Sequence, residues 1–234
     1  MQKNTILHPQ YGKIELTINP RARRIIMRAR PDALYITIPP VASISDIEKA
    51  LATQHDKLQK LQEATKQIII KGGYTLHAPN FNIEVQESVK ERLILHKIEK
   101  GRYLLLYPES KSDKYVEYQQ MLRKTIIRAM QHCAKELLPK RLSQLASKHK
   151  FKYNSVSVRN SRTRWGSCSN RGNISLSSYL VLLSDKLIDY VLLHELCHTV
   201  EMNHSPRFWQ LLDTVCNGEA KILRKELRSY KTDF

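Results

Sequence analysis

The stretch HELCHTVEMNH, from His194 to His204, constrains the fold of this chain most, because it places three of the nine histidines within eleven residues. On a helix, His194 and His198 stand about one turn apart, so both imidazoles project from one face and can share a metal ion. Glu195 lies beside them, where its carboxylate can take a proton from an activated water. The pattern predicts a helix that carries a metal site.

His204 is the predicted third ligand. The Ser205–Pro206 pair is typical of an N-cap and first position of a new helix, so a turn at 201–203 would bring His204 back toward the other two histidines. Three protein ligands with an open fourth position are typical of catalytic zinc. Two alternatives stay open. Glu201 would be the third ligand if the helix continued, because it shares a face with His194, or the histidines could be core residues without a metal.

The residues around this motif favour a buried helix. The run LIDYVLL precedes the motif, and Ser184 followed by Asp185 is typical of a capped helix start. A buried helix that carries two histidines and a glutamate needs partners for these polar groups. The flanks therefore support the metal site.

The remaining patterns predict an α+β chain. Alternating runs over residues 12–40 indicate strands of a twisted antiparallel sheet, and a helix is expected from residue 45 to about 66. Further strands are expected at 81–87, 101–108, 154–160 and 172–180, a long helix at about 112–150, and two short helices at the end. Pro139 should kink or divide the long helix. No internal repeat is visible. We expect an N-terminal β-rich lobe with one helix over residues 1–108, and a catalytic domain over residues 109–234, in which the HExxH helix packs on a small sheet.

Composition limits the location and the partners. The chain has 39 Lys and Arg residues against 22 Asp and Glu, a net charge of +17, which favours anionic partners or substrates. Its four cysteines form no CxxC pair, the first residues hold no apolar signal segment, and no apolar run is long enough to span a membrane. We therefore expect a cytoplasmic protein without membrane contact. The oligomeric state cannot be read from the sequence.

The run RWGSCS from Arg164 to Ser169, followed by GNISL, HELCH and NHSPRFW, resembles in order and spacing the YgjP-like metal-dependent hydrolases, which are zincin-fold proteins related to the SprT metallopeptidases. The resemblance extends to the N-terminal lobe and covers nearly the whole chain. It implies one zinc ion per chain on His194, His198 and His204, with Glu195 as the catalytic acid/base. Metzincins share the spacing but have Gly at the position of Glu201, so the chain is not assigned to them.

Three function classes stay open. The resemblance favours a zinc metallopeptidase, and it also allows a UTP-type nucleoside triphosphate pyrophosphohydrolase that uses the same metal site. A nucleic-acid-associated, SprT-like protease is the third class. The charge of +17 supports it, and so does a strand with Arg24, Arg28 and Arg30 on one face, although such a face is more simply explained by solvation.

The candidate substrate residues are Arg164, Trp165, Gly166 and Arg207. From Lys152 to Ser184 the chain has five basic residues and no acidic one, and such a segment beside a divalent cation would attract anions. Simpler interpretations are that Trp165 packs its loop on the core and that Gly166 serves a turn. For a peptidase, residues 173–180 are the predicted strand edge that binds an extended peptide. Arg164, Tyr179, Tyr190 and Arg207 are the candidates for stabilising an oxyanion.

Overall fold

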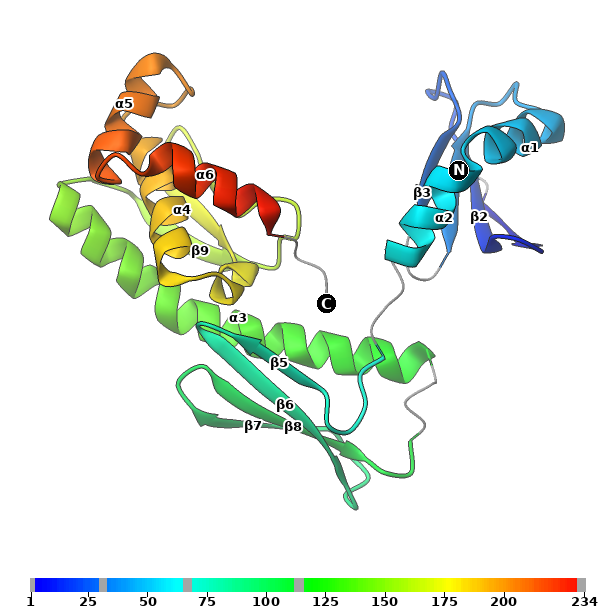
Figure 1. Cartoon of the computed structure of the whole chain (residues 1–234), viewed down its shortest axis with the longest axis horizontal. Helices are drawn as coiled ribbons and strands as arrows, with labels where there is room; N and C mark the ends of the chain where they lie inside the picture. Colours follow the sequence, from blue (N-terminus) through cyan, green and yellow to red (C-terminus); the bar gives the residue numbers. More distant parts are fainter. Residues whose placement is uncertain (1–2, 30–32, 65–68, 112–115, 231–234) are drawn as a thin grey trace. The chain divides into compact units, whose positions relative to one another are not determined.

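The computed structural model describes residues 3–29, 33–64, 69–111 and 116–230. The chain forms two compact units, Met1–Ile68 and Ile69–Asp233, which are called the first and the second unit below (Figure 1). The second unit contains every predicted site residue. No helix in the described ranges is both long and apolar enough to cross a membrane, and the cysteines at 133, 168, 197 and 216 are free.

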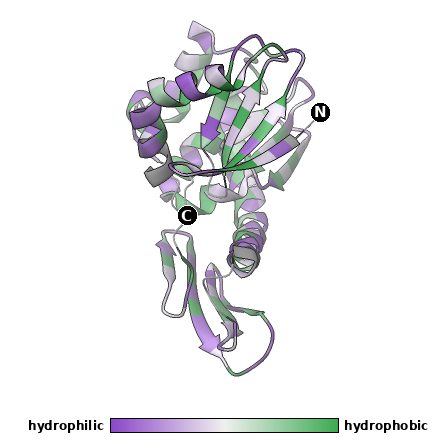
Figure 2. Ribbon diagram, turned by 90° about the vertical axis from the view of Figure 1, so that its right-hand side faces the viewer, coloured by the Kyte–Doolittle hydropathy of each residue, from purple (hydrophilic) through white to green (hydrophobic). Residues whose placement is uncertain are grey.

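The first unit consists of one mixed sheet and two helices. Its elements are β1 (Lys3–His8), β2 (Gly12–Ile18), β3 (Ile26–Ala29), β4 (Leu34–Ile38), α1 (Ile44–Thr53) and α2 (His55–Ala64). The strand order is β1-β2-β4-β3. Hydrophobic and hydrophilic residues alternate along the strands (Figure 2), and one face buries Leu34 and Ile36 against Leu51 and Leu58 of the helices. This unit therefore has a core of its own.

Two predictions for the first unit need correction. The sheet is not wholly antiparallel, because β2 and β4 pair in parallel; alternation along a strand fixes which face is buried but not the strand direction. The expected helix from residue 45 is two helices that meet at Gln54, and its predicted end at 65–66 lies outside the described residues. Arg24 and Arg28 are exposed as predicted, although Arg24 precedes β3, and Arg30 lies outside the described residues.

The second unit begins with another four-stranded sheet. Its strands are β5 (Thr75–Ala78), β6 (Phe81–Ser88), β7 (Ile94–Glu99) and β8 (Arg102–Pro108), in the order β5-β6-β8-β7. As in the first unit, the two inner strands are parallel and each outer strand is antiparallel to its neighbour. The sequence shows no repeat, but the structure repeats this strand order.

The long helix α3 (Val116–His149) attaches this sheet to the rest of the second unit. Tyr103 Oη lies 3.1 Å from His132 Nδ1, and the Cys133 thiol donates a hydrogen bond of 3.2 Å to the Asn80 carbonyl. The observed boundary between units is consequently at residue 68, not at the expected 108. The helix is not divided at Pro139 but changes direction along its length (Figure 1), and the residues at 112–115 lie outside the described part.

A third sheet and the last helices complete the second unit. These elements are β9 (Ser155–Arg159), β10 (Gly166–Cys168), β11 (Asn173–Ser177), a 3-10 helix (Ser178–Leu182), α4 (Asp185–Cys197), α5 (Pro206–Val215) and α6 (Ala220–Ser229). The strand order is β10-β11-β9, so β11 is the central strand. The prediction that residues 173–180 form the free edge is therefore wrong. The edge strand that contacts α4 is β10, which was predicted as loop.

Candidate metal centre and active-site cavity

Helix α4 positions the first two site residues. Ser184 caps the helix by accepting a hydrogen bond of 3.4 Å from the amide of Leu187, and Asp185 lies in the first turn. Arg141 of α3 anchors the helix by binding both oxygens of Asp189, with Nη2 3.0 Å from Oδ2. The helix is buried along most of its length. Its last turn therefore presents His194 and Glu195 on a rigid support.

A turn after α4 brings the third histidine back. The helix ends at Cys197, with His198 as its C-cap, and Ser205 starts α5 by accepting a hydrogen bond from Phe208. Within this turn, His198 Nδ1 lies 3.1 Å from the carbonyl oxygen of Glu201. When Nδ1 donates to that carbonyl, the lone pair of Nε2 stays free. Since the helix does not continue to residue 201, the alternative of Glu201 as third ligand loses its basis.

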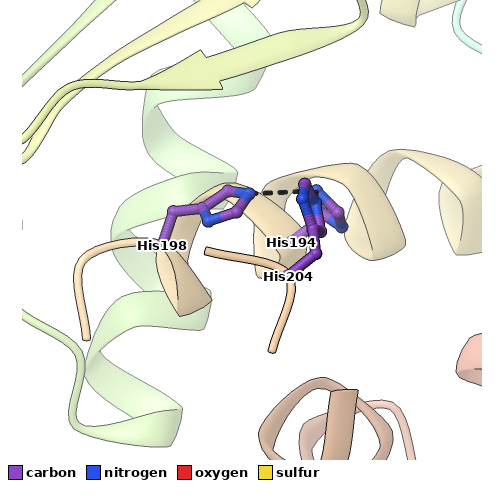
Figure 3. Close-up of side chains that lie close together, drawn as sticks. All are labelled: His194, His198 and His204. Carbon is purple, nitrogen blue, oxygen red and sulfur yellow. Dashed lines mark hydrogen bonds between the residues drawn. The ribbon is translucent and has the colours of Figure 1, made fainter. Parts of the chain in front are cut away.

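The three imidazoles point toward one another (Figure 3). Nε2 of His194 lies 3.2 Å from Nε2 of His198 and 3.1 Å from Nε2 of His204, and one nitrogen of each ring lies within 4.8 Å of the others. Nitrogens bound at about 2.0–2.1 Å to one tetrahedral ion are roughly 3.3 Å apart. Burial and the neighbouring histidines lower the pKa of His194 to about 3, so its ring is neutral near pH 7. The residues present fit a divalent ion such as zinc.

Aromatic side chains of α5 pack against the histidine rings. Phe208 stacks on His198 with the ring centroids 4.5 Å apart, and Trp209 stacks on His204 at 5.4 Å. The guanidinium of Arg224, from α6, lies 4.4 Å above the Trp209 ring, at a distance typical of a cation–π contact. Because these contacts already hold the histidine rings in place, the rings would lose less conformational entropy on binding a metal ion.

Glu195 has the environment of a general base. Its side chain is 5% exposed, and its Oε2 atom is buried without a hydrogen-bond partner in the described part of the chain. Burial raises the pKa of this carboxyl from 4.5 to about 7. A base is most effective when its pKa lies near the working pH. A buried carboxylate without a partner would be costly in a purely structural role.

Gly166 of β10 makes room for this carboxylate. A Cβ atom at residue 166 would lie 2.6 Å from Oε1 and 2.7 Å from Cγ of Glu195. Any side chain there would push the glutamate away from its position. The interpretation of Gly166 as a turn residue is therefore incomplete, because Gly166 begins a strand and permits close packing on the glutamate.

A cavity of about 330 Å³ opens beside His194 and Glu195. Residues from the start of β10, from α4 and from α6 line it: Arg164, Trp165, Gly166, Tyr190, Val191, His194, Glu195, Arg224, Leu227 and Arg228. Three of the four predicted substrate residues thus lie in one cavity with the glutamate. Arg207 is exposed on α5 and does not line it, and the oxyanion candidate Tyr179 is buried elsewhere, whereas Tyr190 lines the cavity.

Sequence reasoning missed Arg224 and Arg228. They lie four residues apart on α6, so they share a face of that helix with Leu227. The spacing of these residues in the sequence is typical of a basic amphipathic helix. The sequence does not show which part of the fold the face with Arg224 and Arg228 contacts, because this depends on the packing of α6 against α4.

Comparison with known proteins identifies the family. The family described as YgjP-like, metallopeptidase domain, matches residues 23–230. The chain belongs to the YgjP-like family. Membership confirms the resemblance seen in the sequence and the expected α+β metallopeptidase fold. A YgjP-like chain is a metal-dependent hydrolase, and the three histidines could bind its metal ion.

Two solved structures are similar to part of this YgjP-like chain. The metallopeptidase zymogen of Pyrococcus abyssi abylysin is 23% identical, with a TM-score of 0.37, and the match covers 40% of this chain and 93% of that chain. The metallopeptidase zymogen of Methanocaldococcus jannaschii jannalysin is 21% identical, with a TM-score of 0.31, and the match covers 38% of this chain and 96% of that chain. The comparison with curated protein sequences gives no match.

Proposed function

We propose that the chain is a zinc metallopeptidase that binds one zinc ion on His194, His198 and His204 and uses Glu195 as general base and acid. The observation that carries the proposal is the convergence of three Nε2 atoms next to a buried glutamate whose Oε2 atom has no partner among the described residues. When bound, zinc supplies a Lewis acid that polarises the scissile carbonyl and lowers the pKa of water. The protein supplies the rest of the chemistry.

The proton path runs through Glu195. Its Oε2 atom takes the proton of the attacking water and later passes it to the nitrogen of the leaving amine. Burial, which raises the pKa of this carboxyl to about 7, makes both transfers feasible near neutral pH. Tyr190, which lines the cavity one helical turn before His194, is the candidate for donating a hydrogen bond to the developing oxyanion.

The free edge of β10 supports a polypeptide substrate. The amide of Ser177 donates a hydrogen bond of 2.9 Å to the carbonyl of Trp165, so the backbone groups of Trp165 and Ser167 face β11. Those of Gly166 and Cys168 consequently face outward, and in the described residues β10 has no neighbour on that side. An extended peptide paired there would pass directly beside Glu195.

Metal content and hydrolysis measured together test the proposal. Zinc-loaded wild type and Glu195→Gln should each hold about one zinc ion, and only wild type should cleave unfolded casein. Glu201→Gln is a matched control, which should keep both zinc and activity, whereas His204→Gln should lose zinc. A parallel panel of nucleoside triphosphates tests the pyrophosphohydrolase alternative. A wild type that takes up no zinc, or that hydrolyses nucleotides but no polypeptide, would contradict the proposal.

Salt dependence tests the nucleic-acid-associated alternative. The net charge of +17 and the exposed Arg24 and Arg28 support binding to a polyanion. Binding to single- or double-stranded DNA that weakens steeply between low and physiological salt would favour a protease that acts on DNA-bound proteins. The cytoplasmic location stays a prediction.

A further inference from the structure

Three arginines surround the cavity beside Glu195. Arg164 precedes β10, while Arg224 and Arg228 come from successive turns of α6. In the described part of the chain none of the three guanidinium groups makes a hydrogen bond or an ion pair, and that of Arg224 lies over the Trp209 ring. All three arginines are exposed, so an anion from solution can reach them. Glu195 is the single carboxylate among the lining residues. The cavity therefore has a surplus of positive charge.

Two other arginines of the second unit, in contrast, pair with carboxylates. Arg141 binds both Asp185 and Asp189, and Arg102 pairs with Glu99 at 2.8 Å. Cations that gather around one cavity without such partners repel one another, and an anionic ligand would remove that cost.

The shape and chemistry of the cavity limit the ligand. Guanidinium groups bind planar carboxylates in a bidentate way, and Trp165, Val191 and Leu227 provide apolar walls for a side-chain stem. A volume of about 330 Å³ is at the lower end of ligand pockets, which range over about 300–1,000 Å³. It suits one side chain with its adjoining backbone better than a nucleoside triphosphate.

We propose that Arg164, Arg224 and Arg228 form a carboxylate-binding subsite, so that the peptides cleaved carry an acidic side chain or a free C-terminal carboxylate next to the scissile bond. This inference rests on the proposed peptidase function and names its substrate class. Each arginine lines the same cavity as Glu195, so a carboxylate bound there would lie in the cavity that also holds the proposed general base.

Matched peptides test the subsite on the full zinc-loaded chain. Mass spectrometry of a casein digest first locates the cleaved bonds, and synthetic peptides then vary one flanking residue among Glu, Gln and Lys. Wild type should prefer Glu over Gln by about 10-fold or more in kcat/KM, as expected for a hydrogen-bonded charge pair. Peptides with a free or an amidated C-terminus distinguish a terminal carboxylate from a side chain.

Two variants and one control assign the preference to the arginines. Arg228→Gln should reduce the Glu-to-Gln ratio by about 10-fold, and Arg228→Glu should shift the preference toward Lys. Lys225→Gln removes an exposed cation from the same helix that does not line this cavity, and the ratio should stay as in wild type.

Binding to the zinc-loaded Glu195→Gln variant, measured by calorimetry, separates this inference from the proposed function. The Glu peptide should bind more tightly than the Gln peptide. Cleavage of casein without any preference for carboxylates would overturn the subsite and leave the peptidase intact. No cleavage of any peptide would overturn the peptidase function. The calorimetry then decides the subsite, because equal binding of the Glu and Gln peptides would overturn it. UTP binding that exceeds Glu-peptide binding and is lost in Arg228→Gln would overturn it in favour of a phosphate site.

Discussion

The two four-stranded sheets have the same strand order and directions but different surroundings. In the first unit the sheet is covered by α1 and α2, and its buried cluster is apolar apart from the hydroxyl of Tyr11. In the second unit the β5–β8 sheet packs on α3, and the buried polar and charged side chains of the described residues all lie in this unit, Glu195 and His198 among them. The same topology thus serves as a self-contained module in one place and as part of an enzyme in the other.

This difference shows that strand order and direction do not determine whether a sheet supports the candidate site. The β5–β8 sheet is connected to the start of α4, because Asn80 Nδ2 donates to the Leu183 carbonyl at 3.2 Å and to Asp185 Oδ1 at 3.0 Å. Asp185 also pairs with Arg141 of α3. These contacts connect the sheet to the start of α4, and a sheet of identical topology without them need not influence the site.

The largest expected effect comes from cutting the chain at the two alternative boundaries. A fragment from residue 69 onward should fold and bind zinc, whereas a fragment from residue 109 should not fold. The latter loses the β5–β8 sheet and exposes the apolar face of α3, on which Leu122 and Ile126 are fully buried. Circular dichroism during heating, with zinc content, measures this. Cooperative unfolding of the shorter fragment would show that the sheet is dispensable and break the comparison.

Matched core truncations should destabilise the two units separately. Ile36 of β4 and Leu105 of β8 occupy the same place in the two sheets, and both are fully buried. Either change to Ala should cost about 2–5 kcal/mol. Both tryptophans, Trp165 and Trp209, belong to the second unit, so denaturant unfolding followed by tryptophan fluorescence should detect Leu105→Ala and not Ile36→Ala. Equal shifts from both variants would mean that the units unfold together.

The third effect separates the site from the sheets. Gly166→Ala should reduce kcat/KM about 100-fold, because the new Cβ atom displaces Glu195 while zinc content and both sheets stay unchanged. Ser167→Ala, at the next and exposed position of β10, is the control and should keep its activity. Loss of zinc from Gly166→Ala would instead assign the glycine to the stability of the metal site.

The smallest effect concerns pH and only the second unit. Burial raises the pKa of Glu195 from 4.5 to about 7, so the stability that comes from its protonated form is complete below about 4.5 and is lost as pH rises through 7. Zinc-free wild type should therefore lose roughly 1–3 kcal/mol relative to Glu195→Gln between pH 5 and 8. Denaturant midpoints of both proteins at several pH values check this. If stability depends on pH in the same way in both, Glu195 is not the group whose titration changes the stability.

The local parts of this structure could be predicted from the sequence, and the non-local parts could not. The helix over the HExxH motif, its cap at Ser184 and the new helix at Ser205 depend on neighbouring residues, and the structure has all three. The parallel pairing of β2 with β4, the boundary at residue 68 and the three-residue strand β10 depend on contacts between distant segments. For the same reason the histidines were grouped correctly, while the arginines of α6 were not connected to them.

The position of the two α6 arginines has a consequence for how the preference of this cavity can change. Arg224 and Arg228 belong to α6, whereas Glu195 and the three histidines belong to α4 and the turn that leads into α5. Substitutions on the exposed face of α6 therefore change one wall of the cavity without replacing any of these four residues. Selection can thus alter which substrates enter the cavity through α6 alone, while the groups beside the scissile bond are inherited unchanged.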